Sequence, residues 1–151
     1  MTPEEIVSLG KMGGMAMLGL SAIGSGMGAG AAALSAVGAW KKCYAQNRIA
    51  PFMLVTFIGA PLSQTIYGFI LLRMINTAAK GGAPYQALLA AGILGGLAMG
   101  TSAWMQGRAG AVCADALAET GKGAGNYFMA IGIIETVALF TLAFISKAIS
   151  G

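Results

Sequence analysis

The chain lacks most of the charge that a soluble protein carries. Its 151 residues include no histidine, five acidic and nine basic side chains, so that 9% of the chain is charged. A typical soluble domain is about 25% charged. Hydrophobic residues make up 57% of the chain, and the mean hydropathy is +0.77. This balance excludes an ordinary soluble domain and predicts a membrane protein.

Cysteine and clustered basic residues are also scarce. Cys43, in a polar loop, and Cys113, in an apolar run, have neither metal-ligand spacing nor a disulfide framework, so we expect two free thiols. The net charge of +4 could suggest nucleic acid, but the basic residues are scattered around the ends of apolar segments. Contacts with loops and lipid headgroups account for them better, and we expect no nucleic-acid partner.

Four apolar segments are long enough to cross a bilayer as helices, which takes about 20 residues each. They cover residues 12–40, 51–75, 85–117 and 127–149, with polar segments at 41–48, 77–84 and 119–126 between them. Before the first segment, Thr2, Pro3 and Glu5 form a capping box with proline at the first helical position, unlike the basic start of a signal peptide. The sequence therefore predicts an all-α membrane protein that retains its first helix.

An internal repeat divides the chain into two similar parts. A shift of 71 residues aligns SQTIYGF (63–69) with IETVALF (134–140) and pairs Gln64 with Glu135. A shift of 78 residues aligns MGAGAAALSA (27–36) with MQGRAGAVCA (105–114). We predict two duplicated helical hairpins, residues 1–80 and 81–151; chance alignment of Gly- and Ala-rich helices is the alternative.

Glycine is concentrated in the first and third spans, which hold eight and six, against two and one in the others. Several lie four residues apart, as in helices that approach closely in lipid: Gly24 and Gly28, Gly26 and Gly30, and Gly92, Gly96 and Gly100. We therefore expect tight contacts between the odd-numbered spans. The stretch GSGMGAG could also be taken for a phosphate-binding loop, but it lacks the preceding strand that this motif requires.

Glu135 is the only charged residue between positions 123 and 146. A charge at the centre of a membrane helix costs about 2.5–3.5 kcal/mol on insertion scales, so it should face protein or water and serve a function. Ser63, Gln64 and Gln106 lie in other spans, and their oxygens together with one carboxylate suit a monovalent hard cation. A proton would need only the carboxyl and one acceptor, so the amides favour Na⁺ over H⁺. A protonated, structural glutamic acid is the alternative.

Motifs in three spans resemble those of the duplicated four-helix proteolipid of V-type and A-type rotary ATPases, known as the c or K protein of the membrane rotor ring. The resemblance covers essentially the whole chain. The motifs are P-x-x-Q-x-x-Y-G-F (Pro61, Gln64, Tyr67, Gly68 and Phe69), Gln106-Gly107-Arg108, and the pair Glu135 and Thr136.

The resemblance implies one sodium site in each copy and no catalysis by the chain itself. In the sodium-transporting members, the ligands match Glu135, Gln64, Gln106, Ser63 and the backbone carbonyl of Ala60, and a tyrosine matching Tyr67 bonds the glutamate. Ser63 replaces the family's threonine and keeps the hydroxyl. Leu62 and Thr65 replace glycines often seen beside the motif.

The resemblance also implies partners: a homo-oligomeric ring with spans 1 and 3 inside, a stator a/I-type membrane protein that carries an arginine, a central-stalk protein on the cytoplasmic face, and lipid. Other proteins of the assembly would couple ion transport to ATP hydrolysis or synthesis. Basic residues are balanced between the two sides of the membrane, and only their concentration at 41–48 favours cytoplasmic hairpin loops with both termini on the other side. We expect Arg108 to extend toward the cytoplasmic end of its span.

Three other functions fit parts of the sequence. The same rotor protein could carry H⁺ instead of Na⁺. A small secondary transporter built from two repeats would also contain a polar site at the membrane midplane. A purely structural proteolipid would need no function for Glu135 at all.

Overall fold

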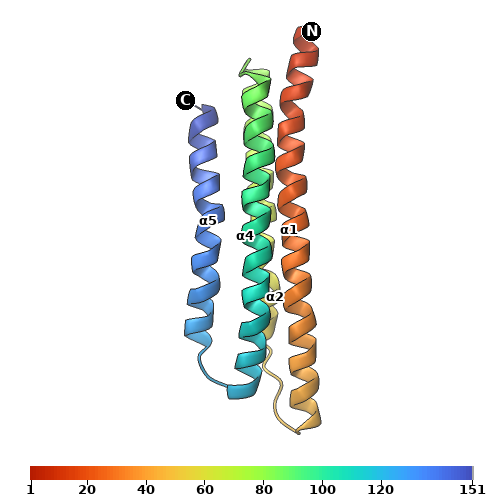
Figure 1. Ribbon diagram of the computed structural model, residues 1–151, viewed down its shortest axis with the longest axis vertical. Coiled ribbons are helices and arrows are strands. Elements are labelled where there is room, and N and C mark those ends of the chain that lie inside the picture. Colours follow the sequence, from red (N-terminus) through yellow and green to blue (C-terminus); the bar gives the residue numbers. More distant parts are fainter. Residues whose placement is uncertain (151) are drawn as a thin grey trace.

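The chain forms a bundle of long helices that lie side by side (Figure 1). The computed structural model describes residues 1–150; Gly151, the last residue of the predicted second hairpin, and the side chain of Ser150 lie outside the described part. The elements are α1 (Pro3–Ala45), α2 (Leu54–Gly59), the 3₁₀ turn η1 (Ala60–Leu62), α3 (Ser63–Lys80), α4 (Tyr85–Thr120) and α5 (Ala124–Ser150). Four stretches are long and apolar enough to cross a membrane: Pro3–Ala45, Leu54–Lys80, Tyr85–Thr120 and Ala124–Ile149. The predicted all-α fold with four apolar helices is confirmed.

The first helix begins where the sequence predicts and ends later. Thr2 Oγ1 accepts a hydrogen bond from the Glu5 N–H at 3.2 Å, and Glu5 Oε2 accepts one from the Thr2 N–H at 2.7 Å, which completes the capping box. The helix then continues to Ala45, so Cys43 is buried within α1 and the expectation of a polar loop there is wrong. Residues 41–45 stay helical because this turn packs against α4, where Cys43 Sγ lies 3.9 Å from Ala118 O. Both cysteines are free thiols.

Helices α1 and α4 run in the same direction and touch through their backbones. A Cβ added to Gly107 would lie 2.1 Å from Gly28 O, a distance that admits no side chain. At six positions a side chain larger than hydrogen would clash with backbone atoms of the other helix. These positions are Gly13, Gly24, Gly28, Gly92, Gly100 and Gly107. The predicted close packing is thus confirmed, but not for Gly26 and Gly30, which lie on the exposed side of α1 with no partner atom within 4 Å.

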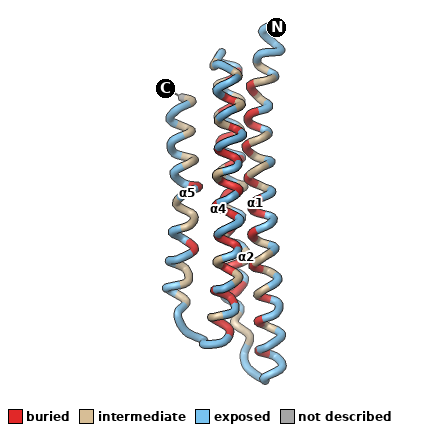
Figure 2. Tube along the Cα trace, viewed as in Figure 1, coloured by how far each residue is buried: buried red, intermediate tan, exposed pale blue. Residues whose placement is uncertain are grey.

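Helix α3 packs antiparallel on α1, while α5 lies at the edge of the bundle. Only 11% of the most apolar window of α5 is buried, against 44% in α4. Figure 2 shows the same difference, because pale blue and tan positions make up almost all of α5 and few are red. In Figure 1 both ends of the chain lie opposite the turns that join α1 to α2 and α4 to α5.

A polar layer divides the apolar core into two clusters. One cluster, nearer the hairpin turns, includes Phe57, Cys113 and Ile131; the other, nearer the termini, includes Leu71, Met99 and Ala138. On each of α3, α4 and α5 a polar residue lies between the two clusters. These residues are Gln64, Gln106 and Glu135, so three long helices contribute polar side chains to the same level of the bundle.

Candidate ion site

Both carboxylate oxygens of Glu135 are held by neighbouring helices. Tyr67 Oη, from α3, donates to Oε1 at 2.9 Å, and Gln106 Nε2, from α4, donates to Oε2 at 3.3 Å. Glu135 is half-buried, and no basic side chain within residues 1–150 forms an ion pair with it. Neutral donors fix the position of the carboxylate but leave its charge uncompensated, and a partly buried charge is stable only when it is paired, so the site suits a cation.

A chain of hydrogen bonds continues from Glu135 through two amides. Gln64 Nε2 donates to Gln106 Oε1 at 2.8 Å. Ser63 Oγ lies 3.2 Å from Gln64 Oε1 and 3.1 Å from the carbonyl oxygen of Ala60. Gln64 is 0% exposed and Gln106 1%, so these amides depend on protein partners rather than water. The structure thus brings all six predicted residues into one network: Ala60, Ser63, Gln64, Tyr67, Gln106 and Glu135.

The 3₁₀ turn η1 shapes the backbone beside this network. Pro61 has no N–H to donate to the preceding turn, which interrupts the α-helical pattern. The predicted span 51–75 is therefore broken: α2 ends at Gly59 and α3 begins at Ser63, whose N–H donates to Ala60 O. A short stretch of 3₁₀ helix within a longer helix often marks a functional hinge or a strained sequence. Here the turn places the Ala60 carbonyl next to the Ser63 hydroxyl.

Two further groups hold the site and were not identified from the sequence. Ser102 Oγ donates to Ile134 O at 2.9 Å and ties α4 to α5 next to Glu135. Gln106 Nε2 also donates to Ile131 O at 3.1 Å. Ser102 could have been predicted from the sequence, because it lies four residues before Gln106 and therefore on the same face of the helix. The carbonyl of Ile131 could not have been predicted, since every residue has a backbone carbonyl.

Arg108 points in a different direction from the one expected. Its guanidinium carbon lies 5.4 Å from the centre of the Trp104 ring, which is one turn closer to the start of α4. Helical side chains tilt toward the N-terminus, and attraction between a cation and an indole face favours the same direction. The expectation that Arg108 extends toward the loop end of its span is therefore wrong. It is exposed, on a different face of α4 from the buried Gln106.

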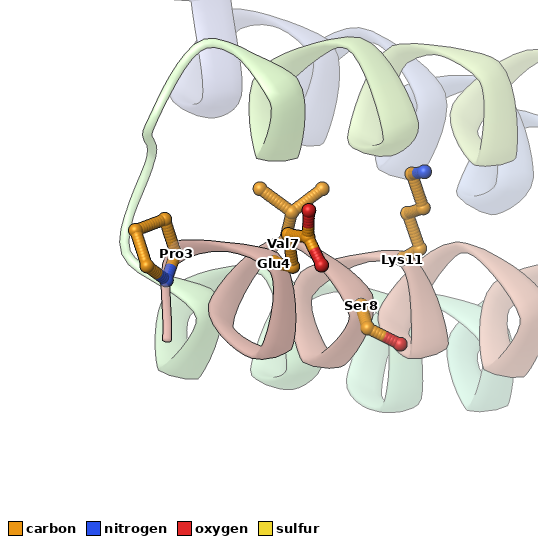
Figure 3. A pocket seen from close by; sticks show the side chains of 5 residues that line it. All are labelled: Pro3, Glu4, Val7, Ser8 and Lys11. Atoms are coloured by element: carbon orange, nitrogen blue, oxygen red, sulfur yellow. The ribbon is translucent and has the colours of Figure 1, made fainter. Parts of the chain in front are cut away.

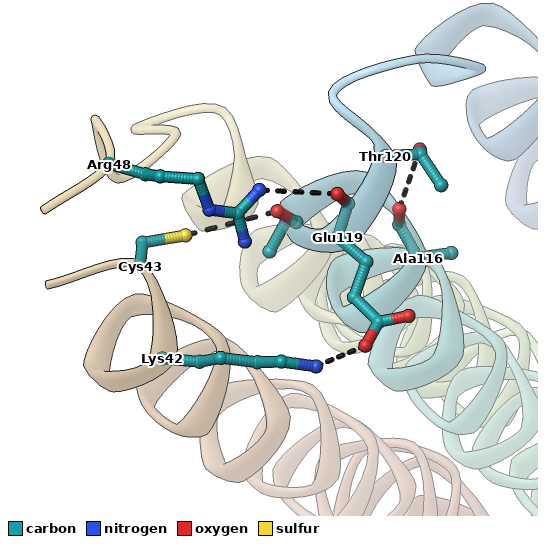
Figure 4. Close-up of polar contacts among 7 residues, drawn as sticks. Lys42, Cys43, Arg48, Ala116, Glu119 and Thr120 are labelled. Atoms are coloured by element: carbon teal, nitrogen blue, oxygen red, sulfur yellow. Dashed lines mark hydrogen bonds and ion pairs between the residues drawn. The ribbon is translucent and has the colours of Figure 1, made fainter. Parts of the chain in front are cut away.

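Other polar features lie at the two ends of the bundle. Near the hairpin turns, Lys42 pairs with Glu119 and Arg48 donates to Glu119 O at 3.2 Å, which ties α1 and its following loop to α4 (Figure 4). At the opposite end, the first turns of α1, from Pro3 to Lys11, line a pocket of about 360 Å³ (Figure 3). None of these residues contacts Glu135, so neither end belongs to the ion site.

Four apolar helices with one carboxylate at the level of two buried amides define a small multi-pass membrane protein. Residues 89–145 match the family of the ATP synthase C subunit. The match extends from Leu89 in α4 to Ile145 in α5 and contains Gln106 and Glu135. This part of the chain, residues 89–145, is thus similar to the c-subunit family, whose members are non-catalytic rotor components that bind the translocated ion. No curated protein matched the chain.

Proposed function

We propose that the chain is the rotor-ring proteolipid of a V/A-type rotary ATPase and carries Na⁺ across the membrane on Glu135. The observation that supports this is the network joining Glu135 to two buried amides and a hydroxyl. Na⁺ is a hard cation and prefers oxygen ligands. The proposed ligands are Glu135, Gln64, Gln106, Ser63 and the backbone carbonyl of Ala60, with Tyr67 bonded to the carboxylate.

One carboxylate balances one monovalent cation, so the loaded site is neutral and can face lipid as a ring turns. A carbonyl oxygen has two lone pairs, so Gln106 Oε1 can contact the cation while it still accepts the bond from Gln64. The empty carboxylate is costly in lipid and should remain near a positive group. We propose that this group is the arginine of a stator a/I-type membrane protein.

Energy for transport must come from other proteins of the assembly. Moving one charge through a membrane potential takes about 2.3 kcal/mol per 100 mV. We propose that ATP hydrolysis or synthesis in the soluble part of the enzyme is coupled to the ring by a central-stalk protein at the cytoplasmic hairpin turns. Both termini then lie on the other side of the membrane.

Ring assembly follows from the unequal packing of the helices. We place α1 and α4 on the inside, because their backbone contacts suit the smaller circumference, and α3 and α5 outside. The two hairpins, 1–80 and 81–151, would repeat this arrangement within each copy. An exposed, apolar groove between α4 and α5, lined in part by Met105, Ile133 and Val137, is where we expect the next copy to pack.

Carbodiimide labelling of Glu135 tests the sodium proposal. Membranes containing the protein are labelled at fixed pH over a range of NaCl concentrations, with KCl at equal ionic strength as the control. We expect protection by Na⁺ and none by K⁺. Labelling that responds to pH but not to Na⁺ would refute the sodium proposal and favour H⁺.

Electrophoresis tests the ring. A rotor ring should migrate as a large SDS-resistant oligomer. A monomer or dimer in mild detergent would contradict the ring and favour a two-repeat transporter.

A further inference from the structure

Ser25 in α1 carries a buried hydroxyl outside the network around Glu135. It is 2% exposed, and its Oγ has no hydrogen-bond partner within residues 1–150. The preceding buried serine on the same face, Ser21, donates to the Met17 carbonyl of its own helix at 2.7 Å. Because a buried hydroxyl without a partner is unfavourable, Ser25 is expected to gain one in another state of the protein.

The register of α1 against α3 places Ser25 opposite Gln64. A Cβ added to a glycine shows this register at three points: Gly10 lies against Ala79 at 2.9 Å, Gly68 against the Ser21 hydroxyl at 2.6 Å, and Gly28 against Pro61 at 3.0 Å. In each antiparallel pair the residue numbers add up to 89, as those of Ser25 and Gln64 do. The last two pairs bracket Ser25 and Gln64 at intervals of three and four residues, so both residues lie on the facing sides of their helices.

Gln64 has a donor that suits this hydroxyl. Its amide nitrogen carries two hydrogens, and one is donated to Gln106 Oε1 at 2.8 Å. Its oxygen lies on the other side of the amide, where Ser63 Oγ is 3.2 Å away. The second hydrogen of Nε2 and the unpaired oxygen of Ser25 are therefore complementary groups at one level of the bundle.

We propose that Ser25 is a positioning residue of the ion site and accepts the second N–H of Gln64 when the ion is bound. This bond holds the amide in one orientation, with Oε1 toward Ser63 and the cation. Helix α1 thus contributes to a site whose ligands come from the other elements of the bundle. The inference rests on the proposed sodium function.

The test compares Ser25→Ala with Ser21→Ala in membranes that contain the assembled protein. The readout is the NaCl concentration that halves carbodiimide labelling of Glu135, and labelling without Na⁺ at the unsubstituted rate is the control for folding. Loss of one hydrogen bond predicts sodium affinity about 2- to 12-fold weaker in Ser25→Ala. Ser21→Ala should leave the affinity unchanged. If Ser25→Ala fails to assemble, Ser25→Cys, which retains a weak acceptor, should show an intermediate loss.

A double-mutant cycle separates positioning from general packing. In a Gln64→Leu background, Ser25→Ala should cause no further loss of sodium affinity, because the amide it orients is gone. An equal additional loss, or no loss in the single variant, would overturn the role of Ser25 while leaving the sodium site intact. Absence of sodium protection in the unsubstituted protein would instead overturn the sodium function, and the Ser25 proposal with it.

Discussion

A methyl group at Gly107 should force α1 and α4 apart. The added Cβ would lie 2.1 Å from Gly28 O, 2.2 Å from Gly28 C and 2.3 Å from Gly28 Cα. All three are backbone atoms that cannot rotate away. To restore an ordinary van der Waals contact, the two helices must move apart by roughly 1 Å along the line from the added Cβ to Gly28 O. Overpacking of this kind costs about 1–3 kcal/mol. The Gly107→Ala variant should therefore be less stable despite alanine's higher helix propensity.

Gly30→Ala is the matched control on the same pair of helices. A Cβ there meets no atom within 4 Å, so the substitution should add only helix propensity, about 1 kcal/mol in favour of alanine. The gain in propensity is common to both substitutions, so the two variants should differ by the overpacking cost of about 1–3 kcal/mol, or roughly 2–12 °C in thermal midpoint for a chain of this size. Circular dichroism in one mild detergent measures both. A midpoint for Gly107→Ala equal to or above that of Gly30→Ala would refute the packing argument.

Three other substitutions address the site and the loop end. Tyr67→Phe removes the 2.9 Å hydrogen bond to Glu135 and should raise the NaCl concentration that halves carbodiimide labelling of Glu135 by at least about 10-fold. An unchanged concentration would contradict the role of Tyr67 in holding the carboxylate. Glu135→Gln should abolish carbodiimide labelling at this position and sodium transport in vesicles reconstituted with the whole ATPase while the oligomer still forms, and persistent transport would exclude Glu135 as carrier. Glu119→Gln breaks the exposed pair with Lys42, so we expect a small loss in thermal midpoint that vanishes in high salt.

Local signals in the sequence predicted the parts of the fold that depend on neighbouring residues. The capping box at Thr2 needs only a hydroxyl and a carboxylate three residues apart, and both bonds form. The position of Glu135 was also predictable, because a lone charge in an apolar helix must be held by other groups. Motif resemblance supplied its partners, among them Gln106 and Tyr67, from distant parts of the chain.

Features that depend on which helix face meets which partner were not predictable. Gly26 and Gly30 have the same spacing as Gly24 and Gly28, yet two residues along a helix is more than half a turn, so only one pair faces α4. The Arg108 side chain packs over the Trp104 ring and does not extend toward the loop end of α4. No pattern in the sequence places Ser25 opposite Gln64, because that position depends on the register between α1 and α3.

The first hairpin carries an amide where the second carries the carboxylate, and the geometry provides a reason. Gln64 Nε2 donates to Gln106 Oε1 at 2.8 Å. A carboxylate at position 64 could only accept, so Gln106 Oε1 would lose its donor and face another acceptor. A second charge would also add about 2.5–3.5 kcal/mol to insertion, and one Na⁺ could not neutralise both. The amide therefore keeps the polar layer at one negative charge, which fits the proposed transport of one monovalent ion by four helices.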